Sequence, residues 1–238
     1  MKHLEDIVEN QQCELARQRL EIERVQAARE CENLINKLEH YAETGRWDDV
    51  ANLFALKTPG VSAEELGFDG YEGGKAVWED WALGHKSGWR PGFLCVNTTT
   101  TTVVEVAKDC QTAKMVFVSP GIETSERSGK WQAYWIWCKL GVDFTKEDGK
   151  WKIWHYHVYG IFTTPYEKSW TEGAKGSPMQ DAGIVEGPMP DGAPPGVINI
   201  KPNKKSTHPV WWWSSDKYND TVPAPPEPYE TFNNKTAY

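Results

Sequence analysis

The segment that decides the fold is WQAYWIWCKLGVDFTKEDGKWKIWHYHVYGIF, residues 131–162. Aromatic and β-branched residues fill both halves of this segment, and the sequence Glu147-Asp148-Gly149-Lys150 lies between them. Asp-Gly favours the tight turns that join antiparallel strands, because the backbone of these turns matches the strand twist. The segment therefore predicts a long β-hairpin, with strands at 131–146 and 151–162.

Further strands are expected before this hairpin. The segment 94–106 contains five consecutive Thr residues and several Val, whose branched side chains suit a pleated surface, and a second strand is expected at 112–124. A brief strand is also expected at 66–71. The second half of the domain is therefore predicted to be a meander of strands.

Helices are expected in the first part of the chain. Residues 2–44 contain no Gly and no Pro, and apolar residues recur there at helical spacing up to Gly45, a typical residue after a helix end. Shorter helices are expected at 47–56 and 75–85. Helices followed by a strand meander predict an α+β protein with an antiparallel sheet, and they argue against a doubly wound parallel fold.

Composition divides the chain into three parts. Residues 1–24 form a strongly polar helical extension that either packs on a second subunit or frays. Residues 25–170 form the α+β domain. Residues 171–238 hold 11 of the 15 Pro residues and show little periodicity, so we expect an extended C-terminal arm that wraps the body or a neighbouring subunit.

Charge and composition exclude several classes of protein. The formal net charge is −8 and the longest basic run is Lys204-Lys205, so no nucleic-acid partner is expected. No apolar stretch approaches the roughly 20 residues that a membrane span needs, and the N-terminus lacks the apolar core of a signal peptide. The five Cys residues lack CxxC spacing, which fits reduced thiols. We therefore expect a cytoplasmic protein without membrane association.

Aromatic residues are abundant, with 13 Trp, 9 Tyr and 7 Phe. Trp and Tyr combine a large apolar body with one polar atom, so they suit the walls of a pocket as well as a core. Trp47, Trp78 and Trp81 are most simply explained as core residues packed on the sheet. A small-molecule ligand with an aromatic ring is the expected partner.

Four segments lie in a characteristic order along the chain. They are AETGRWDDVANLF (42–54), YEG (71–73) before a helix, NTTTTTVVEV (97–106) and EDGKWKI (147–153). Together they resemble the SnoaL-like family of the nuclear-transport-factor-2-like superfamily, across about residues 25–165. The resemblance implies a cone-shaped curved antiparallel sheet packed with N-terminal helices, to which this chain adds its C-terminal arm.

The resemblance does not define one activity, because this fold hosts dehydratases, isomerases, cyclases, lyases and binding proteins. The long arm rich in Trp and Pro is similar to that of a branch of lyases. These enzymes act on lignin-derived diaryl compounds and release formaldehyde without a cofactor. The resemblance therefore implies a lyase that uses no cofactor.

The last predicted strand carries the most informative chemical pattern. Alternation along a strand places His155, His157 and Tyr159 on one face, together with Ile153. We predict that this face lines the cavity, that His157 or His155 moves protons in catalysis, and that Tyr159 binds the substrate. The alternatives are hydrogen-bonded structural histidines and a metal site. We expect no metal, because a third ligand at suitable spacing is missing.

Other residues are weaker candidates. The resemblance places Glu43 where dehydratases carry an Asp on the first helix, and Asn97 where several carry a catalytic His. The alternative for Glu43 is simple exposure to water. Asp143 lies on the facing strand, where it could orient a histidine. The remaining candidates for substrate binding, whose alternative is a solvated or purely structural position, are Tyr41, His85, Arg90 and Trp137.

The predicted function is a cofactor-independent lyase that acts on a hydroxylated aromatic small molecule. A histidine would provide acid–base catalysis for loss of water or formaldehyde. Two alternatives use the same pocket: an isomerase or cyclase, and a binding protein without catalysis. A homo-oligomer, either a dimer or a trimer, is expected.

Overall fold

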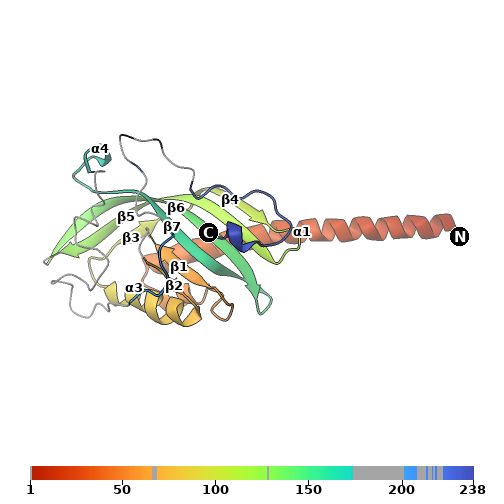
Figure 1. The fold of residues 1–238 in the computed structure, drawn as a ribbon, viewed down its shortest axis with the longest axis horizontal. Coiled ribbons are helices and arrows are strands. Elements are labelled where there is room, and N and C mark those ends of the chain that lie inside the picture. Colours follow the sequence, from red (N-terminus) through yellow and green to blue (C-terminus); the bar gives the residue numbers. More distant parts are fainter. Residues whose placement is uncertain are drawn as a thin grey trace.

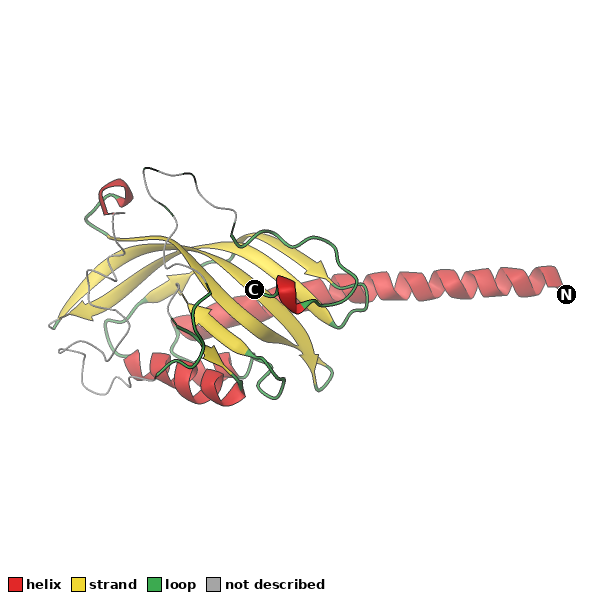
Figure 2. Cartoon of the chain, viewed as in Figure 1, coloured by secondary structure: helices red, strands yellow, loops and turns green. Residues whose placement is uncertain are grey.

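A computed structural model describes residues 2–65, 69–127, 129–173, 201–207, 213, 216, 218 and 222–238. One long helix and a curved sheet dominate the molecule, and the first half of that helix extends away from the body (Figure 1). The helices within residues 2–88 lie over one face of the sheet (Figure 2). The mixed α+β class and the curved sheet expected from the sequence are confirmed.

The long helix α1 spans Lys2–Glu43 without a break, as predicted. Its second half packs on the sheet through side chains at helical spacing, including the buried Ala27, Cys31 and Ile35. Gly45, two residues after the end of this helix, has a φ of +72°. A Cβ atom at this position would also lie 2.6 Å from the Trp89 ring, so both the backbone and the packing require glycine.

The other helices are short. Helix α2 spans Trp47–Ala51, which is shorter than predicted. The helix predicted at 75–85 begins as a π-helix, η1 (Ala76–Ala82), and continues as α3 (Leu83–Gly88). Near the other end of the chain, a helical turn α4 (Trp170–Gly173) and a 3₁₀ turn η2 (Asn234–Thr236) are present.

The sheet has seven strands, in the order β2-β1-β7-β6-β5-β3, and β4 also pairs with β5. Their bounds are β1 Ser62–Glu65, β2 Tyr71–Glu72, β3 Cys95–Asn97, β4 Thr100–Val106, β5 Thr112–Arg127, β6 Lys130–Glu147 and β7 Lys150–Pro165. All pairs are antiparallel except β1 with β7, which is parallel. The predicted antiparallel sheet therefore has one exception, at the strand beside β7.

The predicted hairpin is confirmed. Strands β6 and β7 are joined at Asp148 and Gly149, whose φ angles of +50° and +72° are those of a tight hairpin turn. The strand predicted at 94–106 is instead divided into β3 and β4. The brief strand predicted at 66–71 lies partly outside the described residues, which omit 66–68; the described strands beside it are β1, which ends at Glu65, and β2, which begins at Tyr71.

Strand β7 contains a β-bulge that controls which side chains face the core. Phe144 pairs with Ile153, but the preceding residue Asp143 pairs with His155, so Trp154 has no partner on β6. The extra residue reverses the alternation at this point. Ile153 and Tyr156 therefore both belong to the core, although three positions separate them in sequence.

The described parts of the C-terminal arm lie against the body. Lys204 forms a bridge with Gly70 at the edge of the sheet. Farther along, the backbone N–H of Lys108 donates to the carbonyl of Tyr229, and the N–H of Tyr238 donates to the Asp143 carboxylate at 2.9 Å. Among the described helices, none has both the length and the apolar character of a membrane span.

Candidate active site

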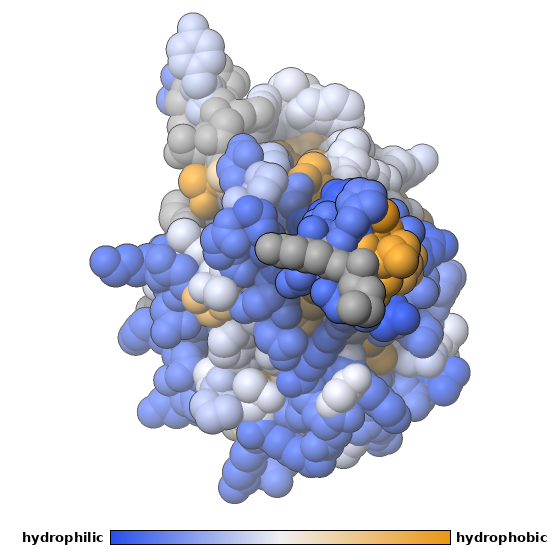
Figure 3. Space-filling view, turned by 90° about the vertical axis from the view of Figure 1, so that its right-hand side faces the viewer, coloured by the Kyte–Doolittle hydropathy of each residue, from blue (hydrophilic) through white to orange (hydrophobic). Residues whose placement is uncertain are grey.

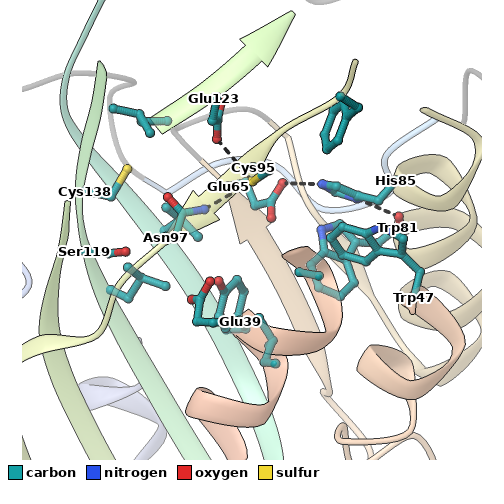
Figure 4. Close-up of a pocket in the computed structure, with 17 residues that line it drawn as sticks. Glu39, Trp47, Glu65, Trp81, His85, Cys95, Asn97, Ser119, Glu123 and Cys138 are labelled. Atoms are coloured by element: carbon teal, nitrogen blue, oxygen red, sulfur yellow. Dashed lines mark hydrogen bonds and ion pairs between the residues drawn. The ribbon is translucent and has the colours of Figure 1, made fainter. Parts of the chain in front are cut away.

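A cavity of about 220 Å³ lies between the inner face of the sheet and helices α1, α2, η1 and α3. Figure 4 shows the side chains that line it. Its aromatic walls include Trp47, Trp81, Phe93 and Tyr156. The polar and titratable lining residues are Glu39, Glu65, His85, Cys95, Asn97, Ser119, Glu123 and Cys138.

His85 is fixed by contacts at both ring nitrogens. Its Nδ1 lies 2.9 Å from the carbonyl oxygen of Trp81, one helical turn earlier. A carbonyl can only accept a hydrogen bond, so Nδ1 carries a proton. Its Nε2 lies 3.3 Å from Oε2 of Glu65, and the Trp47 ring lies against the imidazole with the ring centroids 4.4 Å apart. Nε2 is therefore the nitrogen that can exchange a proton within the cavity.

The two partners favour each other's charge. Burial opposes the cation on His85, but the Glu65 carboxylate outweighs it and raises the pKa of His85. Burial likewise opposes the anion on Glu65, yet His85 holds the pKa of Glu65 below its usual value. Attraction thus exceeds desolvation in both groups, and together they form a carboxylate–imidazolium pair.

Two further carboxyl groups of the cavity have raised pKa values, in contrast to Glu65. Burial, with the charge of Glu65 added, raises the pKa of Glu39 to about 8 and that of Glu123 to about 7. Glu39 has no hydrogen-bond partner among the described residues, whereas Glu123 accepts from the Cys95 thiol at 3.7 Å. At neutral pH Glu39 is therefore a carboxylic acid that can donate a proton.

Figure 4 shows how these groups are arranged. Glu123, Glu65 and Glu39 follow one another down the cavity, and His85 approaches Glu65 from the helical side. The Asn97 amide donates to the Cys95 sulfur at 3.3 Å. The cavity therefore combines a histidine, an ionised carboxylate and a neutral acid, which are the components of proton transfer.

Of the residues predicted from the sequence, His85 and Asn97 line this cavity. The predicted pair of histidines does not. The lining residues of β7 are Tyr156 and Val158, so His155 and His157 point to the other face of the sheet. The bulge at Trp154 explains why Ile153 lies in the core while these histidines do not.

A polar cluster on the outer face of the sheet holds these histidines. His155 Nδ1 lies 2.8 Å from Asp143, and His157 Nε2 lies 3.1 Å from Glu64. Asp143 also accepts from Lys114 Nζ at 2.7 Å. Tyr159 stacks on His157, with the ring centroids 3.8 Å apart. These contacts match those of structural histidines covered by the C-terminal arm.

The other four predicted residues lie elsewhere. Glu43 is exposed near the end of α1, with His40 3.9 Å away, and Tyr41 lies under the Arg46 guanidinium. Arg90 forms an ion pair with Glu126 at 2.9 Å. Trp137 stacks on Phe162. None of Glu43, Tyr41, Arg90 and Trp137 is among the described residues that line the cavity.

Sequence analysis missed the three acidic residues of the cavity. A signal existed for Glu39, because it lies four residues after Ile35, within the stripe that packs on the sheet. Glu65 and Glu123 gave no comparable signal, because carboxylates on strands are usually solvated. Among the described residues, no group of three His, Cys, Asp or Glu side chains could hold a metal ion.

The fold and the enclosed cavity define an α+β cone of the nuclear-transport-factor-2-like kind. Residues 23–157 match the model of the SnoaL-like domain, which is more than half of the chain. The chain belongs to this family, which confirms the resemblance seen in the sequence. A search of curated proteins finds no match.

Solved structures with the same fold are distant in sequence. The crystal structure of LinA is 12% identical, with a TM-score of 0.53 over 63% of this chain and 96% of that chain. A hexachlorocyclohexane dehydrochlorinase, LinA type 2, is also 12% identical, with a TM-score of 0.52 over 63% and 95%. A putative scytalone dehydratase from Novosphingobium aromaticivorans is 16% identical, with a TM-score of 0.47 over 60% and 89%. At these identities the likeness concerns the fold.

Proposed function

We propose that the protein is a cofactor-independent lyase that eliminates water from a neutral, hydroxylated aromatic molecule bound in the cavity. The observation that carries this proposal is the His85–Glu65 pair, which opens on a cavity that also holds the carboxyl group of Glu39. Structures of similar fold include a protein described as a dehydrochlorinase, which supports elimination chemistry on this scaffold. Release of formaldehyde from diaryl compounds stays a prediction.

His85 acts as the base. In its neutral form, Nδ1 donates to the Trp81 carbonyl and Nε2 presents a lone pair to the cavity. His85 Nε2 and Glu65 Oε2 lie 3.3 Å apart, which is longer than the 2.7–2.9 Å of a tight charge-assisted hydrogen bond. The contact is therefore loose enough for Nε2 to accept a proton from a bound substrate. When His85 takes the proton, Glu65 stabilises the imidazolium that forms.

Glu39 acts as the acid. The C–H bond next to an activating carbonyl gives its proton to His85, its electron pair forms the C=C bond, and the C–O bond to the hydroxyl breaks. Glu39 donates its proton to the leaving oxygen, which departs as water. The proton on His85 then returns to Glu39 through solvent, which restores both groups.

The lining also indicates the charge and shape of the substrate. Among the described lining residues, His85 is the one side chain that can be cationic, and Glu65 already neutralises it. A carboxylate or phosphate substrate would meet three acidic residues without a free cation. The Trp47, Trp81 and Phe93 rings suit a flat apolar molecule, and Asn97 and Ser119 can hydrogen-bond its oxygen atoms.

The test compares two histidines. Neutral one-ring aryl ketones with a β-hydroxyl group are incubated with the protein, and the conjugated product is followed by its ultraviolet absorbance. His85→Gln is expected to lower kcat by about 10²–10⁴-fold, the range for loss of a general base. His157→Gln, on the outer face, is expected to retain activity if circular dichroism shows that it folds. A folded His157→Gln that is inactive, beside an active His85→Gln, would contradict the proposal.

A further inference from the structure

The first half of α1 extends away from the described part of the body (Figure 1). All side chains from residue 3 to residue 23 are exposed. The first described side-chain contacts with the sheet are the ion pair of Glu23 with Lys146 and the hydrogen bond that Arg24 donates to the Val106 carbonyl. Figure 1 shows this part of the helix extending alone. Isolated helices in water are marginally stable, and tertiary packing usually stabilises them. We therefore expect a binding partner to stabilise this projecting part of the helix.

This helix carries an apolar stripe that no described residue covers. Its members, with their exposed fractions, are Leu4 (67%), Val8 (50%), Leu15 (53%), Ile22 (57%) and Val25 (72%). Gln11 and Gln18 fill the two remaining positions of this stripe. With them, the stripe advances alternately by four and by three residues from Leu4 to Val25. This is the seven-residue repeat of a coiled-coil seam. Figure 3, which faces the N-terminal end of the helix, shows apolar side chains gathered along one flank.

The stripe points away from the body. At 3.6 residues per turn, each residue advances by about 100°, so Ile22 and Val25 lie roughly half a turn from Ala27 and Cys31. Ala27 and Cys31 are buried against the sheet. A second helix could therefore pack on the stripe without colliding with the sheet domain. In such a dimer the two sheet domains would lie on opposite sides of the helix pair.

We propose that this stripe binds the same stripe of a second copy of the chain, as a parallel two-stranded coiled coil. In the heptad notation, Val8, Leu15 and Ile22 are a positions, and Leu4, Gln11, Gln18 and Val25 are d positions. β-Branched residues at a favour two strands, and a polar residue within the seam fixes the register. This inference is independent of the lyase proposal.

Charge favours the parallel arrangement over the antiparallel one. A parallel pair places each g residue beside the next e residue of the other helix, which brings Glu14 of one copy to Arg19 of the other, twice by symmetry. An antiparallel pair would instead bring g residues together, and these include Glu14 and Glu21. The parallel dimer gains two opposite-charge contacts, while the antiparallel dimer gains like-charge ones.

The first experiment measures the mass of the full chain in solution by light scattering, at micromolar concentrations. The wild type is expected to be a dimer, and Leu15→Glu a monomer. The matched control is Leu20→Glu, which makes the same change five residues farther along but on the flank away from the stripe. A monomeric or trimeric wild type overturns the proposal, and so does a Leu15→Glu variant that remains dimeric.

The second experiment determines the orientation. In a Cys13→Ser background, which removes the exposed native thiol, Val8→Cys is oxidised gently. A parallel seam places the two introduced thiols side by side, so disulfide-linked dimer should form at least tenfold faster than with Leu20→Cys. A dimer in which Val8→Cys links no faster than Leu20→Cys is antiparallel or associates through the body, and either result overturns the proposal.

Discussion

Nε2 of His85 lies 3.3 Å from Oε2 of Glu65, inside a cavity where two other carboxyl groups favour their neutral forms. The pair concentrates one cation and one anion at the centre of the site. Glu65 raises the pKa of each of its titratable neighbours, because its negative charge disfavours another anion and favours a cation. This single carboxylate therefore prepares both the base and the acid of the proposed reaction.

The pH profile of kcat/KM should be bell-shaped. The base must be unprotonated, so activity rises with pH through the pKa of His85, which lies above its usual value. The acid must be protonated, so activity falls through the pKa of Glu39, at about 8. The optimum should lie between these two limbs. A profile that is flat from pH 6 to pH 9 would refute the assignment.

Glu65→Gln should move the rising limb of this profile to lower pH. Glutamine removes the negative charge that raises the pKa of His85, while burial, which lowers it, remains. The maximum kcat should also fall, because the imidazolium loses its counter-ion. The measurement is kcat/KM against pH for the variant and the wild type. A matched control is Glu43→Gln on the exposed end of α1, whose profile should superimpose on that of the wild type.

Glu39→Gln should stabilise the fold at alkaline pH while it abolishes the proposed acid. The pKa of Glu39 is about 8 in the folded state against 4.5 for an ordinary carboxyl group. Between these values the folded state binds more protons than the unfolded state, so the stability contributed by this group falls as pH rises. At pH 8 the variant should be more stable by about 1–3 kcal/mol, and at pH 4 it should match the wild type.

The measurement is urea unfolding at the two pH values, with Glu43→Gln as the control at the end of the same helix. The variant and the wild type could differ in unfolding free energy by the same amount at pH 4 and at pH 8. That result would show that the added stability does not come from the titration of Glu39.

The cluster on the outer face should be structural. Asp143 is fully buried and holds Lys114, His155 and the backbone N–H of Tyr238. Asp143→Ala leaves the Lys114 cation buried without its partner, a change that typically costs about 3–5 kcal/mol. Asp49→Ala, which removes an exposed ion pair with Arg46, should change stability by less than about 1 kcal/mol. Equal losses in the two variants would argue against the role of the cluster.

Much of the fold could be predicted because local sequence determined it. Asp148-Gly149 predicted the hairpin, and the absence of Gly and Pro before Gly45 predicted the long helix. The parallel pairing of β1 with β7 could not be predicted, because it joins segments about 90 residues apart and depends on tertiary packing.

The site was harder to predict than the fold. Simple alternation placed His155 and His157 in the cavity, and a single unpaired residue, Trp154, places them outside it. His85 was recognised only as a candidate for substrate binding, because its partner Glu65 belongs to a strand that the pattern did not locate. Contacts between distant segments, which composition and spacing do not encode, create this pair.

The bulge in β7 also bears on how such a cavity can change its chemistry. One residue decides which set of side chains, Tyr156 and Val158 or His155 and His157, faces the interior from this strand. Because Trp154 is the extra residue, its loss would leave His155 opposite Asp143, and both sets would keep their faces. A strand that paired Trp154 with Asp143 would instead shift by one position and exchange the two sets. A one-residue change of register in this strand, rather than many substitutions, is therefore enough to change the interior chemistry of the cavity.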